Sequence, residues 1–518
     1  MIKRIEIDIA PDKAFDDVHL RKVASEHSGI RPERVTDLVL VRRSLDARRK
    51  PPIYRVAFDV YVEATPQKAE PHTGRLLHAT ADHKVIIVGA GPAGYFAGLQ
   101  LLEHGIQPVI FDRGKDVQKR RKDLRAIQQF GTVNPDSNYC FGEGGAGTYS
   151  DGKLYTAAKK RGNIRKVLEL LVEHGAHADI LVDAHPHIGS NKLPQIVQAI
   201  RHTIEGHGGE VHFDSRVTDF VIRDKTIYGV IVNDEQEHLA ANVILATGHS
   251  ARDIYELLHQ KNIRVEPKPF AMGIRIEHAQ VLIDKIQYHM RPRSRHLPAA
   301  SYKMVAQVDG RGVFSFCMCP GGLIVPAATA PGEIIVNGMS LSGRDSAFAN
   351  SGIVVSVELD DVRRQHGPDP LAGLRYQRNT EERLFAAGDG SQQGPSQRMI
   401  DFIEERVSDS LPATSYIPGL YSAPLHELLP APIATRLQKA MLMFGSHKTG
   451  FLTNDAVLVG MESRTSAPVR IPRHRSSLEH VDIKNLYPCG EGAGYAGGIV
   501  SAAVDGQNVA TAVGGKMG

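Results

Sequence analysis

Tryptophan is absent from this sequence of 518 residues, and cysteine occurs only four times. Four cysteines cannot form a dense disulfide framework in a chain of this length, so we expect a reduced compartment and a cytoplasmic protein. The first residues, Met1-Ile-Lys-Arg-Ile-Glu, lack the apolar region of a signal peptide. Uninterrupted apolar runs of about eighteen residues are also missing, which gives no reason to expect a membrane span.

Charge of either sign is not in large excess. The formal net charge is +4, and hydrophobic and charged residues make up 42% and 23% of the chain, as in ordinary globular proteins. A mildly basic balance gives no reason by itself to expect nucleic acid as a partner. The length predicts more than one domain.

A strand–turn–helix–strand pattern lies near residue 90. The apolar run at residues 85–88 leads directly into Gly89-x-Gly91-x-x-Gly94, and a second apolar run ends at Asp112. In this context the glycine fingerprint predicts a dinucleotide site. Gly89 permits a tight turn, Gly91 lets backbone N–H groups approach a pyrophosphate, and Gly94 lets the helix pack closely on the strand. Asp112 is placed to accept hydrogen bonds from a ribose.

The hydrophobic pattern divides the chain into segments. Residues 1–65 predict a small α+β domain, of which a ferredoxin-like fold is the simplest form, and residues 66–83 read as a linker. The dinucleotide-binding domain is expected to be discontinuous, over residues 84–250 and 423–518. Residues 251–422 carry strands of their own and are expected to form an inserted substrate domain.

Two further glycine-rich loops accompany the fingerprint. The first is Gly142-Glu-Gly-Gly-Ala-Gly-Thr-Tyr-Ser-Asp-Gly-Lys153, and the second is Gly490-Glu-Gly-Ala-Gly-Tyr-Ala-Gly-Gly498, which precedes a helix. Such loops indicate either backbone brought close to a ligand or flexibility, and a dinucleotide-binding chain favours the ligand. We expect Lys153 to face the electron-rich edge of a flavin, with Asp151 orienting the loop.

Catalytic candidates are few. Cys317 and Cys319 lie one residue apart, so an extended strand would place both on one face. The pair could consist of redox-active thiols, soft metal ligands or small buried residues, and the pattern does not decide among these. Lys153 and His249 are candidate polar helpers. His185 and His187 have no nearby third ligand, so we expect no metal site.

The order of these blocks resembles the glutathione-reductase-like superfamily of FAD-dependent oxidoreductases. The blocks are the fingerprint with Asp112, Val217 on a strand, Ala246-Thr-Gly248, and Gly490-Glu491 before Gly497-Gly498-Ile499. The first glycine-rich loop and Cys317-Met-Cys-Pro-Gly-Gly322 resemble, more closely, a bacterial family of FAD-dependent or NAD(FAD)-utilising dehydrogenases.

This resemblance implies an α/β fold with a Rossmann-type FAD-binding domain, a mixed α+β insertion and a small N-terminal α+β domain. It implies non-covalent FAD, with Gly498 and Ile499 directing a helix N-terminus toward the flavin and Glu491 standing where the superfamily usually carries Asp. The implied cofactor-binding residues are Gly89, Gly91, Pro92, Ala93, Gly94, Asp112, Arg113, Gly145, Gly147, Thr148, Asp151, Gly152, Lys153, Val217, Ala246, Thr247, Gly248, Gly490, Glu491, Gly497, Gly498 and Ile499.

The predicted function is an FAD-dependent oxidoreductase that transfers a hydride or electron pair to or from a small organic substrate. A second strand–GxGxxG–helix unit is missing from the sequence, so we expect no separate NAD(P)H domain, although NAD(P)H as a transient donor and a protein donor or acceptor stay open. The alternatives are a flavin-dependent RNA-modifying enzyme and a non-catalytic carrier or regulatory protein that binds FAD or a lipid. Substrate, reaction direction and oligomeric state are not predicted.

Overall fold

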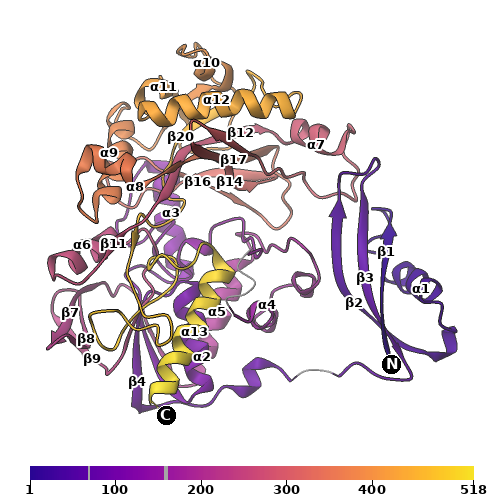
Figure 1. Ribbon diagram of the computed structural model, residues 1–518, viewed down its shortest axis with the longest axis horizontal. Coiled ribbons are helices and arrows are strands. Elements are labelled where there is room, and N and C mark those ends of the chain that lie inside the picture. The colour runs from indigo at the N-terminus through magenta and orange to yellow at the C-terminus, as the bar shows by residue number, and fades with distance from the viewer. Residues whose placement is uncertain (68–69, 157–161, 518) are drawn as a thin grey trace.

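The structure is a computed structural model that describes residues 1–67, 70–156 and 162–517. The residues between these ranges belong to the expected linker and dinucleotide-binding segments and lie outside the described part. A small N-terminal domain stands beside a larger body, to which a long connecting segment joins it (Figure 1). The body contains two units, each built around its own sheet.

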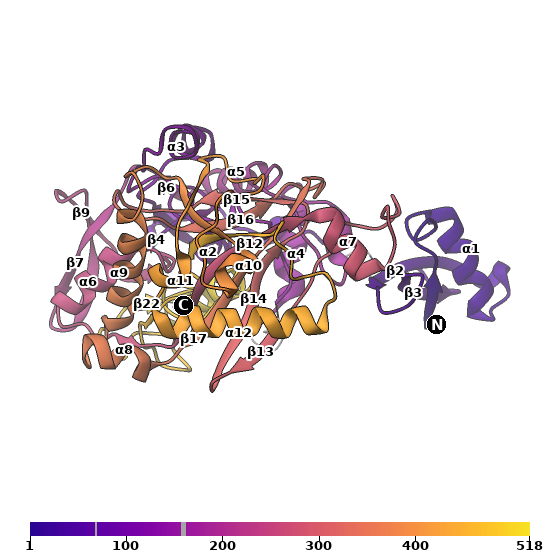
Figure 2. The ribbon, with the colours of Figure 1, turned by 90° about the horizontal axis from the view of Figure 1, so that it is seen from above.

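The N-terminal domain is a three-stranded antiparallel sheet with one helix. The strands β1 (Ile2–Ile9), β2 (Val35–Asp46) and β3 (Ile53–Val62) lie in the order β1-β3-β2. Alternate residues of β3 are buried, and helix α1 (Asp17–Ser28) packs on that face. The described residues give a β-α-β-β order without the second helix and fourth strand of a complete ferredoxin-like fold. Figures 1 and 2 show β2 nearest the body.

The first unit of the body is built on a parallel sheet with the order β22-β10-β4-β5-β6. The helices α2, α5 and α13 cover one face, and α13 packs closely on α2, since a Cβ at Gly506 would lie 2.1 Å from the Ala93 carbonyl oxygen. The antiparallel strands β7, β8 and β9 and helix α6 pack with the other face. The bounds are β4 (Thr80–Val88), α2 (Pro92–Glu103), β5 (Ile106–Phe111), α5 (Leu193–Gly206), β6 (Glu210–His212), β7 (Val217–Arg223), β8 (Thr226–Val232), β9 (Gln236–Leu239), β10 (Val243–Leu245), α6 (Arg252–Gln260), β22 (Leu486–Pro488) and α13 (Ile499–Met517).

The second unit is built on a seven-stranded sheet with the order β13-β14-β17-β12-β20-β18-β19. All neighbours in it are antiparallel except β18 and β19, and helix α12 lies along one face (Figure 2). The bounds are β12 (Phe270–Ala279), β13 (Val305–Val308), β14 (Arg311–Cys319), β17 (Phe348–Val357), β18 (Gly394–Arg398), β19 (Leu420–Ser422), α12 (Ala431–His447) and β20 (Val457–Glu462).

The second unit extends past the boundary predicted at residue 422. Strand β20 pairs with β12 in the middle of the sheet, and α12 contributes to the same core. All six residues of β20 are buried, so its sequence lacks the alternation that would mark it as part of this sheet. The segment returns to the first unit only after β20, with β21 (Val469–Arg470) and β22.

The remaining elements are short or connect the two units. Hairpin β15–β16 packs against the large sheet, and β11 pairs with β21. Among the described residues, no helix is both long and apolar enough to cross a membrane. The bounds are α3 (Val117–Phe130), α4 (Ile164–Glu173), β11 (Glu266–Pro267), α7 (Gln280–Tyr288), β15 (Gly322–Pro326), β16 (Val336–Ser340), α8 (Leu359–His366), α9 (Ala372–Ala386), α10 (Met399–Ile403) and α11 (Leu425–Leu428).

Four buried charged side chains, Arg252, Glu333, Glu381 and Arg464, join α6 of the first unit to the second unit. We call them the closed cluster. Arg252 donates to Glu381 Oε1 over 2.8 Å, and Arg464 Nη2 donates to Glu333 Oε1 over 2.8 Å. Their side chains are 8%, 6%, 0% and 7% exposed, respectively. Because two arginines face two glutamates, the charges are balanced at a position that water does not reach.

Candidate functional site

The fingerprint turn joins β4 to α2 and has one open side. Gly89 adopts φ +109°, and a Cβ there would lie 2.5 Å from the Ala246 carbonyl oxygen. A Cβ at Gly94 would lie 1.9 Å from the Gly89 carbonyl oxygen, so only glycine allows this contact between helix and strand. A Cβ at Gly91 would have no other atom within 4 Å. Gly91 also precedes α2 without a side-chain cap, which leaves the helix N-terminus available to an anion.

Asp112 ties the turn to the first glycine-rich loop. Its Oδ2 accepts a hydrogen bond from the Ala90 N–H over 2.8 Å, and its Oδ1 accepts from Gly114 N–H and Gly142 N–H over 2.9 and 3.1 Å. The residue is 7% exposed. A carboxylate has about four acceptor positions, so these contacts leave room for one more donor. The ribose contact of Asp112 stays a prediction.

A cavity of about 610 Å³ opens beyond Asp112. Arg113, Arg216 and Val217 line it; Arg113 pairs with Asp253 and lies over the Phe141 ring at 4.6 Å. Arg216 Nε has no hydrogen-bond partner among the described residues although it is buried. The position and the size of this cavity fit the adenosine half of a dinucleotide.

The two other glycine-rich loops meet at the fingerprint. Gly145 lies against Gly91, since a Cβ at Gly145 would lie 3.3 Å from the Gly91 Cα. Gly147 lies against Ile499, since a Cβ at Gly147 would lie 3.1 Å from the Ile499 side chain. Gly498, just before α13, faces open space. Three loops far apart in the sequence therefore converge on one cradle, to which α2 and α13 both direct an N-terminus. The remaining predicted residues of this cradle are Pro92 and Ala93 at the start of α2, Thr148, which is buried, and Gly497, which faces open space.

Strand β10 supplies the next contact of the cradle. It ends before Ala246, Thr247 and Gly248, and a Cβ at Gly492 would lie 2.4 Å from the Gly248 carbonyl oxygen. His249 Nδ1 lies 3.2 Å from Glu491 Oε2. The structure thus places His249 beside the C-terminal loop, next to the predicted cofactor residues Gly490 and Glu491.

A second group of charges lies where the first glycine-rich loop meets the second unit. Asp151 is 1% exposed; it accepts hydrogen bonds from Ser340 Oγ and from Arg344 Nη2, the latter over 2.5 Å, and its Oδ2 lies 3.3 Å from Lys153 Nζ. Burial raises the pKa of Asp151, but Lys153, Arg344 and the hydrogen bonds lower it to about 2. Lys153 Nζ also donates to the Met318 carbonyl oxygen. The predicted residue Gly152 adopts φ +68° between the two.

Cys317 and Cys319 occupy a bulge at the end of β14. The register against β17 shifts between Phe316 and Cys319, and Cys317 adopts φ +45°, a conformation that L-residues rarely take. Both thiols are free, Cys319 is fully buried and Cys317 is half-buried. The expected common face of an extended strand is therefore replaced by a bulge. Cys319 Sγ donates to the Cys317 carbonyl oxygen over 3.2 Å.

Arg275 lies beneath this bulge and is fully buried. It donates to the Cys317 carbonyl oxygen over 2.7 Å and to Glu462 Oε2 over 2.5 Å, and its Nη2 lies 3.7 Å from Cys319 Sγ. A hydrogen bond with Cys319 lowers the pKa of the Cys317 thiol; burial opposes this, and the charges of Lys153 and Arg275 add to the lowering. We call Asp151, Lys153, Arg275, Arg344 and Glu462 the open cluster.

Comparison with known proteins identifies the cofactor. Residues 82–128 match the family described as an FAD binding domain, and residues 269–465 match the family described as FAD-dependent protein, C-terminal domain-like. Residues 1–61 match a domain of unknown function. The dinucleotide of the cradle is FAD.

An uncharacterized protein from Clostridium beijerinckii is 39% identical over 516 residues, which cover 96% of each chain. This chain belongs to the family of that protein. Solved structures matched include CtdE in complex with FAD (12% identity, TM-score 0.33, 83% of this chain and 84% of that one) and FqzB (14%, 0.36, 86% and 78%). The tetracycline destructase Tet(51) is similar at 11% identity and a TM-score of 0.33, over 84% and 81%. These TM-scores are too low to support a conclusion about this flavoprotein.

In the structure of the flavoprotein, the predicted catalytic residues lie at two separate sites. Lys153, Cys317 and Cys319 meet at the open cluster, whereas His249 contacts Glu491 at the cradle. His187 forms an isolated β-bridge with Lys153, and its Nε2 lies 3.3 Å from the Ser342 carbonyl oxygen. Groups of three or more side chains able to hold a metal ion are absent from the described residues.

Arg275, Glu462 and Arg344 are not among the functional residues predicted from the sequence. Arg275 is the single charge in the apolar run Phe270-Ala-Met-Gly-Ile-Arg-Ile276, and Glu462 ends the apolar run of β20. A lone charge inside a buried strand requires a partner, so this pattern was the available signal. The sequence does not indicate that Arg275 and Glu462 are partners, because they are 187 positions apart.

Proposed function

We propose that this flavoprotein is an FAD-dependent oxidoreductase, a dehydrogenase or reductase of the glutathione-reductase-like superfamily, acting on a small organic substrate. The observation that carries this proposal is the open cluster. Its Lys153 comes from the loop that also forms the cradle, and it reaches the backbone between the two cysteines of the second unit. FAD supplies two-electron redox chemistry when it is bound. The chain supplies binding, orientation and charge.

Binding of the cofactor is assigned to backbone groups more than to side chains. The N-termini of α2 and α13 direct partial positive charge into the cradle, which stabilises the pyrophosphate and the electron-rich edge of the ring. Arg113 and Val217 line the adenosine cavity, and Asp112 holds the turn in place while it offers its remaining acceptor position to the ribose.

The open cluster is assigned to the substrate. Lys153 and Arg275 place positive charge around Cys317, which favours its thiolate. In this proposal Cys317 Sγ takes up the proton that a substrate loses on oxidation, or returns it on reduction. Arg275 does not reach the substrate, since it is fully buried beneath the bulge; it positions the thiol through the Cys317 carbonyl group.

NAD(P)H is the proposed electron donor, bound transiently. The described residues contain one strand–GxGxxG–helix unit, and it lies in the segment that matches the FAD binding domain. A donor would therefore have to reach the flavin through an opening rather than from a nucleotide-binding domain of its own.

The test is anaerobic titration of the purified yellow protein with NADH and NADPH, followed by a screen of oxidised metabolites for reoxidation. We expect reduction of the flavin by one donor, and Cys317→Ser to slow substrate-dependent reoxidation by about 100-fold. Cys140→Ser is the control, because its thiol lies outside the open cluster, with its nearest acceptor, the Ala327 carbonyl oxygen, at 4.0 Å.

Three results would contradict the proposal or a part of it. Lack of flavin absorbance in fresh protein would remove the cofactor assignment. A flavin that stays oxidised with every donor would indicate a carrier or regulatory protein instead. If Cys317→Ser and Cys319→Ser both react as the parent protein does, the cysteines serve packing and the thiol assignment is wrong.

A further inference from the structure

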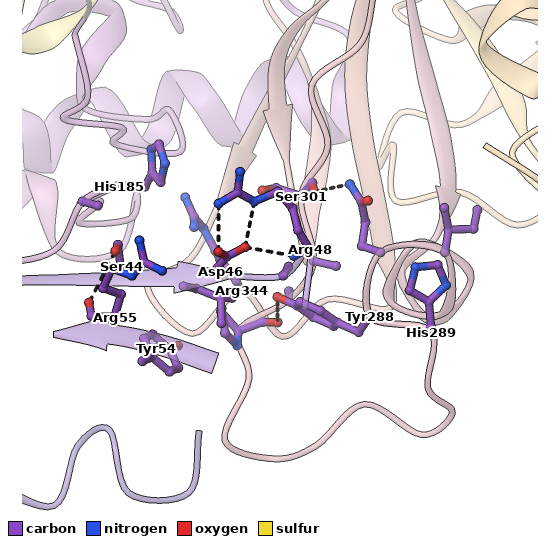
Figure 3. Close-up of a pocket in the computed structure, with 18 of the residues that line it drawn as sticks. Ser44, Asp46, Arg48, Tyr54, Arg55, His185, Tyr288, His289, Ser301 and Arg344 are labelled. Carbon is purple, nitrogen blue, oxygen red and sulfur yellow. Dashed lines mark hydrogen bonds and ion pairs between the residues drawn. The ribbon is translucent and has the colours of Figure 1, made fainter. Parts of the chain in front are cut away.

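A cavity of about 1420 Å³ separates the N-terminal domain from the body (Figure 3). One wall comes from β2 and β3 of the N-terminal domain. The other comes from helix α7, residues 298–301 and residues 447–450 of the second unit, and from residues 183–187 of the first. The cavity therefore exists only where all three parts of the chain meet. Typical small-molecule pockets measure about 300–1000 Å³, so this one has room for an extended molecule.

The acidic side chains that line this cavity are all neutralised by arginines. Asp183 pairs with Arg43 at 2.8 Å, Asp46 pairs with Arg48 at 2.8 Å, and Glu6 lies 3.4 Å from Arg55. The carboxylates therefore do not repel an anion. Because these carboxylates are already paired, they do not compensate the charges of the remaining cations in the lining.

The uncompensated cations lie on opposite walls. Arg42 stands on β2 and Lys285 stands on α7; both are exposed, and neither side chain has an ion pair or hydrogen-bond partner among the described residues. Lys448 donates only to Gln287 Oε1, over 2.9 Å. Four histidines, His185, His187, His289 and His447, share the lining. The cavity thus presents positive charge from both sides without internal partners.

Arg344 marks the inner end of the cavity, where the open cluster begins. Its side chain is 15% exposed and its Nε and Nη2 are held by Asp151, so among the described contacts Nη1 is left for a ligand. Its backbone adopts φ +48°, and a Cβ at Gly321 would lie 1.8 Å from the Arg344 carbonyl oxygen. Non-glycine residues held in this region are strained, and they gather at ligand clamps.

A continuous backbone path links the outer wall to the loop of the open cluster. Arg43 N–H donates to the Val182 carbonyl oxygen over 2.8 Å, and Ala184 N–H donates to that of Arg43 over 2.9 Å. Four residues later, Ile188 N–H donates to the Gly152 carbonyl oxygen over 3.1 Å, next to Lys153. The wall of the cavity and the proposed substrate site are therefore one hydrogen-bonded structure.

We propose that this cavity binds the substrate, and that the substrate is an extended organic anion with at least two separated phosphate or carboxylate groups. Arg344 holds the group nearest Lys153, and Arg42 and Lys285 hold the outer group. That this anion is a substrate rests on the oxidoreductase function proposed above, whereas its binding in the cavity is independent of that function. The N-terminal domain then has a function, as half of the binding site.

The distribution of charge favours a small anion over RNA. Nucleic-acid-binding surfaces are strongly basic stripes along an open face. Here the net charge of the whole chain is only +4, and the unpaired cations line opposite walls of one cavity between the N-terminal domain and the body.

The test is isothermal titration of the oxidised, FAD-loaded protein with tripolyphosphate and with citrate, at low and high salt. We expect one anion per chain, with an affinity that falls as salt rises. Tighter binding of tripolyphosphate would indicate that the site prefers phosphate groups, and tighter binding of citrate would indicate that it prefers carboxylate groups. The double variant Arg42→Gln/Lys285→Gln should weaken binding by about tenfold or more. The matched control is Lys22→Gln/Arg31→Gln, which removes two exposed cations of the N-terminal domain outside the cavity and should change affinity less than about twofold.

Three outcomes would overturn the inference: no binding of either probe at low salt, an equal loss in the control variant, or an RNA oligonucleotide that binds more tightly than both probes and depends on Arg42 and Lys285. Flavin content and the circular dichroism spectrum confirm that each variant is folded. Because no turnover is measured, binding as expected in a protein whose flavin never reacts would refute the oxidoreductase function and leave this inference standing.

Discussion

Two clusters of buried charge join the units of the body, and they differ in balance and in access. The closed cluster sets two arginines against two glutamates, and all four side chains are less than one tenth exposed. The open cluster sets Lys153, Arg275 and Arg344 against Asp151 and Glu462, and Arg344 reaches the large cavity. A balanced, sealed set can only hold the structure together. An excess of cations beside a cavity can also stabilise a thiolate or a bound anion.

The sharpest test of this difference removes one charge from the closed cluster. Glu381→Gln leaves Arg252 and Arg464 without their shared carboxylate, so the free energy of unfolding should fall by about 3–5 kcal/mol. Urea denaturation measures the loss. Glu382→Gln, at the exposed neighbouring position, is the control and should match the parent. A loss as small as the control's would show that the closed cluster does not hold the units together.

A smaller effect is expected from Asp151→Asn in the open cluster, and it should depend on pH. The pKa of Asp151 is lowered from 3.8 to about 2 in the folded state. Its contribution is therefore complete above pH 4 and disappears as the pH falls toward 2, and it amounts to about 2 kcal/mol. Between pH 7 and pH 3, urea denaturation should show a larger loss of stability in the parent than in the variant, in which other carboxylates with lowered pKa values, such as Glu381, still titrate.

Asp345→Asn is the matched control, since that residue is exposed in the same segment. If Asp151→Asn and the parent lose stability in parallel over this pH range, the assignment of the step to Asp151 is wrong.

Lys153→Gln should change thiol chemistry more than stability. Lys153 lowers the pKa of the Cys317 thiol through its charge, so its removal raises that pKa from about 5 and reduces the thiolate fraction at pH 5. Alkylation of Cys317 by iodoacetamide at pH 5, followed by mass spectrometry, should slow by about threefold to tenfold. Lys192→Gln, at an exposed position, should leave the rate unchanged. Equal rates in all three proteins would exclude Lys153 as the source of thiolate stabilisation.

The smallest effect is expected at a surface ion pair, which belongs to neither cluster. Arg4 pairs with Asp59 at 2.7 Å, but the arginine is 66% exposed. Water screens such pairs, so Arg4→Gln should leave Tm unchanged within the error of calorimetry. A drop similar to that of Asp151→Asn would mean that burial does not separate the clusters from ordinary surface charge.

The first unit was the more predictable of the two, because its signals are local. The hairpin strands at residues 217–223 and 226–232 have the bounds expected from alternation, and α5 begins at the expected Leu193. The fingerprint and Asp112 occur within one short segment, so their convergence follows from a single supersecondary unit. The contacts of the predicted cofactor residues with FAD stay predictions.

The second unit was less predictable because its key contacts are not local. The bulge at Cys317 depends on pairing with β17, and nothing in Phe314-Ser-Phe-Cys-Met-Cys319 indicates a register shift. Strand β20 reaches the sheet from beyond the expected boundary, and only this pairing brings Glu462 to Arg275. The large cavity could not be predicted from the sequence, because its walls come from both the N-terminal domain and the body.

The packing of α13 on α2 also has a consequence for biosynthesis. Helix α2 ends at Glu103, but α13 begins only at Ile499, and the close contact of Gly506 with Ala93 needs both. A ribosome therefore exposes the fingerprint turn long before its packing partner is translated. Chains that stop early lack α13 and the helix N-terminus that it directs into the cradle, so a yellow colour would report translation that ran through to the last helix.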